Sequence, residues 1–242
     1  MALVRGAAGA ARWLDKVGVA LLFPKADVVL PSLWEQVNGS ADVDWAVRDA
    51  DGNFVQWSEA MGFLWGAKDD LPEHGLACVG KHVARVATCV APRLVPLLVA
   101  AVEPVEPAED EARVLEAITS EGPLTGPQLR ELTGLPKREV DKAVAVLHRR
   151  LVLTNSHLVE QDGPWGALAH DLVGRKWRVP ARLLSQDDAR RTLAGLLLDR
   201  AGELTAADVA GPFGWRRKAT AELLDEIAAG RDGGGFRIWT AN

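Results

Sequence analysis

Carboxylates and one amide are the side chains of this sequence best suited to acid–base chemistry. Glu160 and Gln161 lie in a polar segment that ends in Pro164-Trp165, and Asp44 lies in the N-terminal half. A carboxylate can act as a general base, and a glutamine amide can orient a water molecule or bind a base edge. Glu160, Gln161 and Asp44 are therefore the candidate catalytic residues, although a surface hairpin with a Pro-Trp anchor is the favoured explanation of the polar segment.

A second group of candidates combines lysine, aspartate and tryptophan. Lys68 and Asp69 follow a tryptophan-rich stretch and could bind a small anionic or aromatic ligand beside it. The alternative, which we favour, is that Trp57, Phe63 and Trp65 belong to the core. The candidate ligand-binding residues are Trp34, Lys68, Asp69, Lys81, Asn155 and Trp165.

Cationic side chains at two predicted helices are candidates for nucleic-acid contacts. A helix that enters the major groove contacts base edges with residues near its N-terminus. A solvated helix face is the alternative, because Glu139 and Asp141 interrupt the basic residues of the first helix. The candidates are Lys137, Arg138, Lys142 and Arg149 in the first helix, and Arg216, Arg217 and Lys218 in the second.

Several other kinds of site are not indicated. The sequence has no Gly-rich phosphate loop of standard spacing and no Gly-x-Ser-x-Gly motif. Its five histidines show no zinc-type spacing, and Cys78 and Cys89 are typical of buried thiols in a reducing compartment. We expect no metal and no cofactor. We also expect a cytoplasmic location, because no apolar run has the length of a membrane span and no signal peptide is evident.

The elements that must position these residues repeat at an offset of 80 residues. Glu121–Thr125 aligns with Ala201–Thr205, and Gly134 aligns with Gly214. Each copy is predicted to form three helices, with a threonine N-cap and a glycine C-cap on the second helix. The predicted helices span 109–120, 126–132 and 137–149 in the first copy, and 186–200, 206–210 and 215–228 in the second.

Extended segments follow the third helix of each copy. Residues 151–154 and 157–159 are predicted to form a hairpin around Asn155-Ser156, and 236–239 a strand returning from a turn at 232–235. Three helices and a hairpin make a winged helix that contains a helix-turn-helix. The predicted fold is therefore mainly α with short β-hairpins (α+β), with tandem winged-helix modules after an N-terminal mixed α/β domain.

Charge and composition divide the chain in the same way. The acidic, Pro-containing segment 103–110 is predicted to link an N-terminal domain (1–102) to winged helices at 111–182 and 183–242. In the first domain we expect helices over 6–20, 31–37 and 93–102, a hairpin with its turn at Asp51-Gly52, and a strand over 83–90. Residues 1–125 carry 10 Lys/Arg and 18 Asp/Glu, a net charge of −8, and the remaining 18 and 15 give +3. The second half thus permits contact with an anion.

Three stretches carry a family resemblance: Pro31–Gln36, then Lys68–Pro72 with Gly80-Lys81, and then Leu151–Thr154 with Val159–Trp165. They resemble the AlkZ-related winged-helix proteins, which are relatives of the YcaQ/AlkZ-type crosslink-repair DNA glycosylases. The resemblance covers roughly residues 10–180 and implies a multi-winged-helix fold, with damaged DNA as the ligand of the wider group. Those glycosylases position the hydrolytic water with Gln-x-Gln or Gln-x-Asp. A near match here, Gln36-Val37-Asn38, is interpreted as a helix end.

Three functions remain open from the sequence. The first is a DNA-associated winged-helix protein, perhaps a DNA-damage binder or a glycosylase-like repair factor without the usual catalytic motif. The second is an enzyme or enzyme subunit of an antibiotic-type biosynthetic pathway that performs metal-free chemistry on an amine-bearing substrate. The third is a non-catalytic protein whose winged helices dock a partner subunit. We place the first ahead because of the resemblance.

Overall fold

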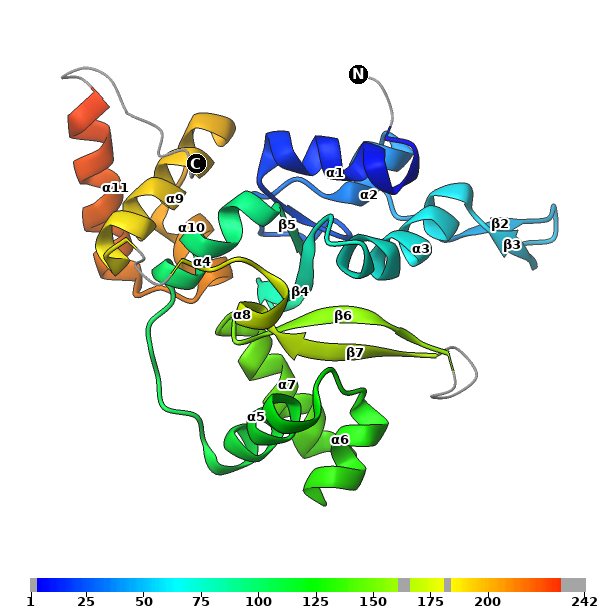
Figure 1. The fold of residues 1–242 in the computed structure, drawn as a ribbon. Coiled ribbons are helices and arrows are strands. Elements are labelled where there is room, and N and C mark those ends of the chain that lie inside the picture. The colour runs from blue at the N-terminus through cyan, green and yellow to red at the C-terminus, as the bar shows by residue number, and fades with distance from the viewer. Residues whose placement is uncertain (1–3, 161–165, 181–183, 232–242) are drawn as a thin grey trace.

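The computed structural model describes residues 4–160, 166–180 and 184–231, which form an α+β protein, mainly helical with small antiparallel sheets (Figure 1). The helices are α1 Gly6–Val17, α2 Leu33–Asn38, α3 Glu59–Glu73, α4 Val95–Ala101, α5 Glu109–Glu121, α6 Gly126–Thr133, α7 Lys137–Arg149, α8 Val173–Lys176, α9 Gln186–Ala201, α10 Ala206–Phe213 and α11 Arg217–Arg231. The strands are β1 Val19–Leu21, β2 Ala46–Arg48, β3 Phe54–Trp57, β4 Cys78–Val83, β5 Val86–Val90, β6 Leu153–Val159 and β7 Ala167–Leu172. No described helix is both long and apolar enough to cross a membrane.

A three-stranded antiparallel sheet, in the order β1-β5-β4, organises the N-terminal part. Successive side chains of a strand point to opposite faces, and the two faces here belong to different cores. Ala20 and Cys89 pack with α1, α2 and α3, whereas Val19 and Val90 pack with α4 and α9. The sheet is therefore covered by helices on both faces, and one covering helix comes from the C-terminal quarter of the chain (Figure 1).

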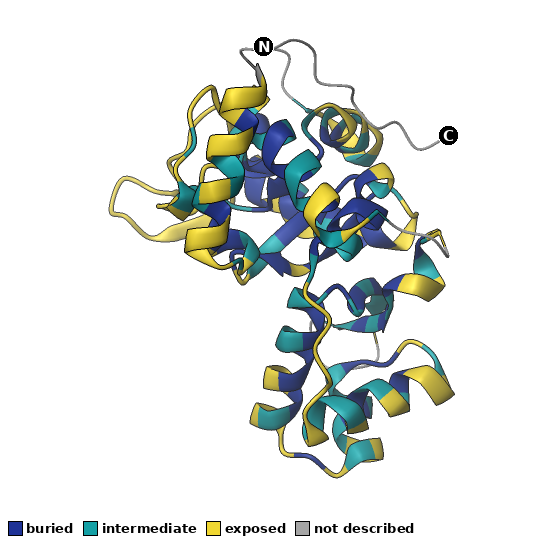
Figure 2. Ribbon diagram, turned by 90° about the vertical axis from the view of Figure 1, so that its left-hand side faces the viewer, coloured by how far each residue is buried: buried dark blue, intermediate teal, exposed yellow. Residues whose placement is uncertain are grey.

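The β2–β3 hairpin projects from this body, as Figures 1 and 2 show. The hairpin over 46–55 was predicted, and the helices and the β5 strand expected in this region are also present. The assignment of the tryptophans to the core is wrong for two of them. Trp57 on β3 is 57% exposed and Trp65 on α3 is 52% exposed, whereas Phe63 packs partly against the core.

The first predicted three-helix unit is confirmed as α5, α6 and α7. Thr125 caps α6 by accepting the backbone N–H of Gln128, and Gly134 ends the helix with a left-handed backbone, φ 69°. The three helices share a core that includes Val114, Ile118 and Leu129. The two strands that follow, β6 and β7, pair antiparallel.

The predicted turn of that hairpin is wrong. Asn155 and Ser156 lie inside β6, and Asn155 pairs with His170 of β7, so the chain reverses after Val159. An Asn-Ser pair favours turns locally, but the pairing with β7 keeps these residues extended.

The second predicted three-helix unit is confirmed as α9, α10 and α11. Thr205 caps α10, and Gly214 ends it with a left-handed backbone, φ 71°. The turn predicted at 232–235 and the strand at 236–239 lie outside the described residues. Residues 103–108 contain neither helix nor strand and run between the two lobes seen in Figure 2.

Candidate functional site

A cavity of about 430 Å³ lies where the N-terminal sheet meets α7 and the β6–β7 hairpin. We call it the junction cavity. Three candidate ligand-binding residues that are far apart in the sequence line it together: Lys68 on α3, Lys81 on β4 and Asn155 on β6. Its polar lining is completed by Asp141, His148 and His170, and its apolar lining includes Leu22, Val79, Ala87, Val140, Val144 and Leu168.

The two lysines of the junction cavity differ in their surroundings. The Lys68 ammonium lies 2.7 Å from both carboxylate oxygens of Asp69 and 4.6 Å from the centre of the Trp65 ring. Lys81 is exposed, and its ammonium has no hydrogen bond or ion pair with any described residue. Lys81 is therefore the lysine whose amine is available to a ligand.

Three histidines form a cluster behind Lys81, in which His82 and His148 are buried and His170 is half-buried. His82 Nδ1 lies 2.8 Å from the carbonyl oxygen of His148, and His148 Nε2 lies 3.1 Å from His170 Nδ1. Because a carbonyl only accepts, His82 must carry its proton on Nδ1, which leaves Nε2 to accept the thiol proton of Cys78, at 3.4 Å. Nδ1 of His148 is buried and has no partner among the described residues.

Burial keeps these histidines uncharged. It lowers the pKa of His82 to about 4. Burial and the nearby Lys81 charge lower the pKa of His170 to about 4. The pKa of His148 lies well below its usual value for the same reason, with further contributions from His170, His82 and Lys81. Burial also raises the pKa of the Cys78 thiol to about 12, so the thiol keeps its proton.

Gly80 packs directly against the histidine cluster, and the space there leaves no room for a side chain. A Cβ at this position would collide with His148 Nδ1 and would lie 2.7 Å from two ring atoms of His82. The strand can thus approach both imidazoles only with glycine here. Among the described residues, no group of three His, Cys, Asp or Glu side chains could hold a metal ion.

A cationic stripe on α7 borders the junction cavity. Arg138, Lys142 and Arg149, which we call the α7 stripe, share one helix face by their spacing. Arg138 and Lys142 are exposed and form no ion pair within the described ranges, whereas the nearby Lys137 pairs with Asp141 at 2.5 Å. The adjacent face of α7 lines the cavity through residues that include Asp141 and His148.

The α7 stripe reaches the second three-helix unit. The guanidinium of Arg149 lies against Gly214, directly before the α11 cluster, which comprises Arg216, Arg217 and Lys218. Arg216 and Lys218 make long ion pairs with Glu103 and Glu222, of 3.8 and 3.9 Å, at strongly exposed side chains. Exposed pairs of this length contribute little, so these charges remain available to an anion.

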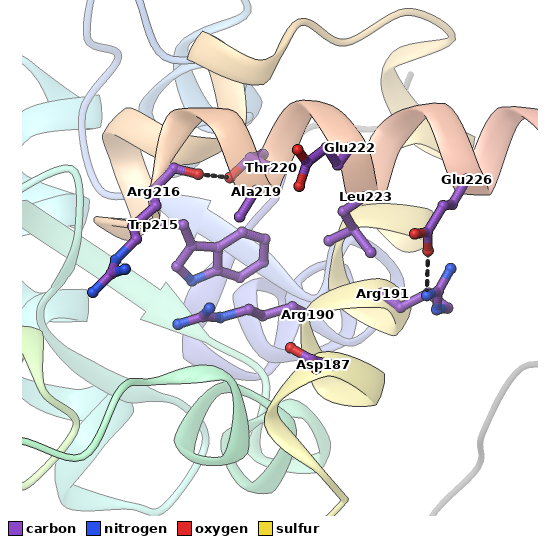
Figure 3. A pocket seen from close by; sticks show the side chains of 10 residues that line it. All are labelled: Asp187, Arg190, Arg191, Trp215, Arg216, Ala219, Thr220, Glu222, Leu223 and Glu226. Carbon is purple, nitrogen blue, oxygen red and sulfur yellow. Dashed lines mark hydrogen bonds and ion pairs between the residues drawn. The ribbon is translucent and has the colours of Figure 1, made fainter.

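A groove of about 250 Å³ lies between α9 and α11 (Figure 3). Contacts of the residues around it fix the position of the α11 cluster. Arg190 lies over the Trp215 ring, 5.4 Å from its centre, and its Nε donates to the carbonyl oxygen of Ala101 at the end of α4. Arg191 pairs with Glu226 at 2.5 Å. These contacts hold the start of α11 against α9 and the end of α4.

The remaining candidates lie apart from the junction cavity. Trp34 is fully buried in the core and its indole donates to the carbonyl oxygen of Asp42. Asp44 is exposed and accepts the backbone N–H of Ala46. Glu160 is exposed at the end of β6, and Gln161 and Trp165 lie outside the described residues. The Gln36–Asn38 segment ends α2, as interpreted from the sequence.

His148 and His170 are the site residues that sequence reasoning missed. They lie 22 positions apart on α7 and β7, and only the pairing of β7 with β6 brings them together. Their spacing carries no signal of its own. The one sequence feature that pointed to this site was Gly80-Lys81, because a glycine inside a strand often marks a place where another group packs closely against the backbone, and here a cation follows it.

A comparison with models of known protein families identifies the family of this chain. Residues 81–238 match the family model AlkZ-like, described as DNA glycosylase AlkZ-like. The match covers well over half of the chain, and the chain belongs to this family. The matched region begins at Lys81 and includes α5–α7 and α9–α11. No curated protein and no solved structure matches the chain.

Proposed function

We propose that this protein is a DNA-associated factor of DNA repair that binds duplex DNA with the α7 stripe and the α11 cluster. The single observation that supports this most is the contact of Arg149 with Gly214, because it brings the end of the α7 stripe close to the start of α11, where the α11 cluster lies. Arginine and lysine on such a surface neutralise phosphates without reading sequence. The family match favours repair over the small-molecule pathway that the sequence left open.

The proposed architecture is two winged-helix modules at 111–182 and 183–242, after an N-terminal domain (1–102) and a linker (103–110). In this arrangement α7 and α11 are the third helices, the ones that approach DNA in a helix-turn-helix. The cap residues Thr125 and Thr205 and the C-terminal glycines support the equivalence of the two modules. The hairpin of the second module would require residues beyond 231.

The junction cavity is the proposed site for the damaged part of the DNA. Lys68, Lys81 and Asn155 contribute ligand contacts there, and the mostly apolar walls can accept an unstacked group. The proposed catalytic residues are Glu160, which follows the end of β6, the exposed Asp44, and Gln161. The protein is proposed to act inside the cell, in the cytoplasm, without a metal or cofactor.

A binding measurement tests this proposal. Fluorescence anisotropy with a labelled duplex, with and without one alkylated base, should show binding at low salt that weakens sharply at moderate salt. Arg217→Gln combined with Lys218→Gln should weaken both complexes to the same extent, because phosphate contacts do not distinguish an alkylated base from an unmodified one. No retention of either duplex at low salt would contradict the proposal.

A further inference from the structure

The amine of Lys81 stands out among the groups of the junction cavity. The other charges of the lining have partners: Lys68 pairs with Asp69, and Asp141 pairs with Lys137. Lys81 forms no ion pair with any described residue, and the two histidines on which its charge acts, His148 and His170, are held neutral mainly by burial. The cavity thus presents one accessible primary amine beside largely apolar walls.

This setting suits covalent chemistry better than the binding of a highly charged anion. A phosphate dianion would be met by one uncompensated charge, and Asp141 would oppose it. A primary amine in a mostly apolar cavity can instead attack a carbonyl carbon, as lysines do when they form Schiff bases. Because Lys81 is exposed at this cavity, an aldehyde carried by a large substrate can reach its amine.

We infer that Lys81 captures the aldehyde of an abasic deoxyribose as an imine. This inference rests on the proposed function for its substrate, because an abasic site is the aldehyde-bearing lesion that base loss leaves in DNA.

The step balances without a further reactant. Lys81 Nζ releases its extra proton to solvent, and its lone pair forms a bond to C1′ of the ring-opened sugar. The carbonyl oxygen leaves as water with the two remaining amine hydrogens, and a carbon–nitrogen double bond remains. Hydrolysis by one water molecule reverses the capture and restores both the lysine and the aldehyde.

His148 and Gly80 shape the same wall. The partnerless Nδ1 of His148 lies against Gly80, the residue that precedes Lys81 on β4. A side chain at position 80 would displace that imidazole, so glycine sets the depth of the cavity next to the amine. An uncharged imidazole here adds no second cation that would compete for a ligand.

Borohydride trapping tests the inference with the full chain. A labelled duplex with one abasic site, incubated with the protein and sodium borohydride, should give a covalent adduct on a denaturing gel. Lys81→Ala should abolish the adduct, and Lys81→Arg should also abolish it while it keeps the positive charge. Lys16→Ala, an exposed lysine on α1, should leave the adduct unchanged.

A probe without a duplex separates this inference from the proposed function. The protein is incubated with 2-deoxyribose 5-phosphate and sodium cyanoborohydride, and the modified lysine is located by peptide mass spectrometry. Modification concentrated at Lys81 supports the inference even if no duplex is bound. Trapping that survives Lys81→Arg, or that moves to Lys68 or spreads evenly over surface lysines, would overturn it, as would duplex binding with no adduct.

Discussion

Gly80 shows how a single residue sets the geometry of the junction cavity. Because a Cβ there would collide with His148 and press on His82, both 3% exposed, neither ring can move away freely. We expect Gly80→Ala to lower the free energy of unfolding by about 1–3 kcal/mol, the usual effect of overpacking a core. Urea denaturation followed by circular dichroism measures this change.

The matched control is Gly62→Ala in the exposed face of α3, where an added Cβ meets nothing within 4 Å. Alanine replaces a flexible residue inside a helix there and should stabilise by roughly 0.5–1 kcal/mol. Equal effects of the two substitutions would show that the cavity wall is not tightly packed at Gly80.

The buried histidines make stability depend on pH. His82 and His170 have a folded-state pKa of about 4, below the value of 6.5 for a free histidine. Between these values the unfolded chain binds protons that the folded chain does not, so stability rises with pH. The contribution of these histidines to the free energy of unfolding is fully present above about pH 6.5 and is lost as the pH falls toward 4. The charged groups around the cluster are Lys81, Asp141 and Lys176.

Denaturation at pH 7.5 and pH 5.5 checks this dependence. His82→Gln should lower stability at both values but reduce the difference between them, because one suppressed titration is removed. His74→Gln, at an exposed residue on the end of α3, should leave the difference unchanged. A pH difference that His82→Gln does not reduce would contradict the buried, neutral state of the cluster.

At the scale of elements, local capping chemistry decides where helices begin and end. Thr125 accepts the N–H of Gln128, and the Gln128 side chain accepts the N–H of Thr125 at 2.8 Å. We expect Thr125→Ala to cost about 1 kcal/mol. The control is Thr119→Ala on the exposed face of α5, where alanine has the better helix propensity and should be neutral or slightly stabilising. Thermal unfolding that ranks the two in the opposite order would refute the capping role.

These capping signals explain what the sequence could predict. Thr125 with Gly134, and Thr205 with Gly214, are local signals, and they sufficed to place both three-helix units. The β4 strand was missed because Gly80 and Lys81 interrupt its apolar pattern. The turn was misplaced at Asn155 because pairing with β7, a tertiary effect, outweighs the local preference of Asn-Ser.

The candidate site was predictable only in part. Lys68, Lys81 and Asn155 could be named from residue type and neighbours, but their meeting in one cavity depends on how three elements pack. Trp34 carried the same kind of signal and lies in the core instead. A side chain's chemistry is local information, whereas its exposure is set by distant parts of the chain.

At the scale of the molecule, the second three-helix unit packs against the N-terminal sheet. Leu193 on α9 is 1% exposed and shares a core with Val19 and Val90 of the sheet. We expect Leu193→Ala to destabilise by about 2–5 kcal/mol and to speed hydrogen exchange in β1 and β5 as well as in α9. Leu132→Ala, at a leucine that is 53% exposed on α6, serves as the control and should change little. Faster exchange confined to α9 would show that the two parts unfold independently.

This packing also bears on function, because it fixes the α11 cluster beside the α7 stripe. Arg190 bonds to Ala101 and stacks on Trp215, while Arg149 lies against Gly214. The end of the α7 stripe thereby lies close to the α11 cluster, although the chain as a whole is acidic, with a net charge of −5. The distribution of charge, more than its sum, permits a nucleic-acid partner.

The salt dependence of DNA affinity tests the central claim most directly. Each phosphate contact contributes about 0.9 to the slope of log affinity against log salt concentration. Arg138→Gln with Lys142→Gln should reduce that slope by about 2, whereas Arg12→Gln with Lys16→Gln, an exposed Arg–Lys pair of the same spacing on α1, should leave it unchanged. Equal slopes for the two double variants would contradict DNA binding through the α7 stripe.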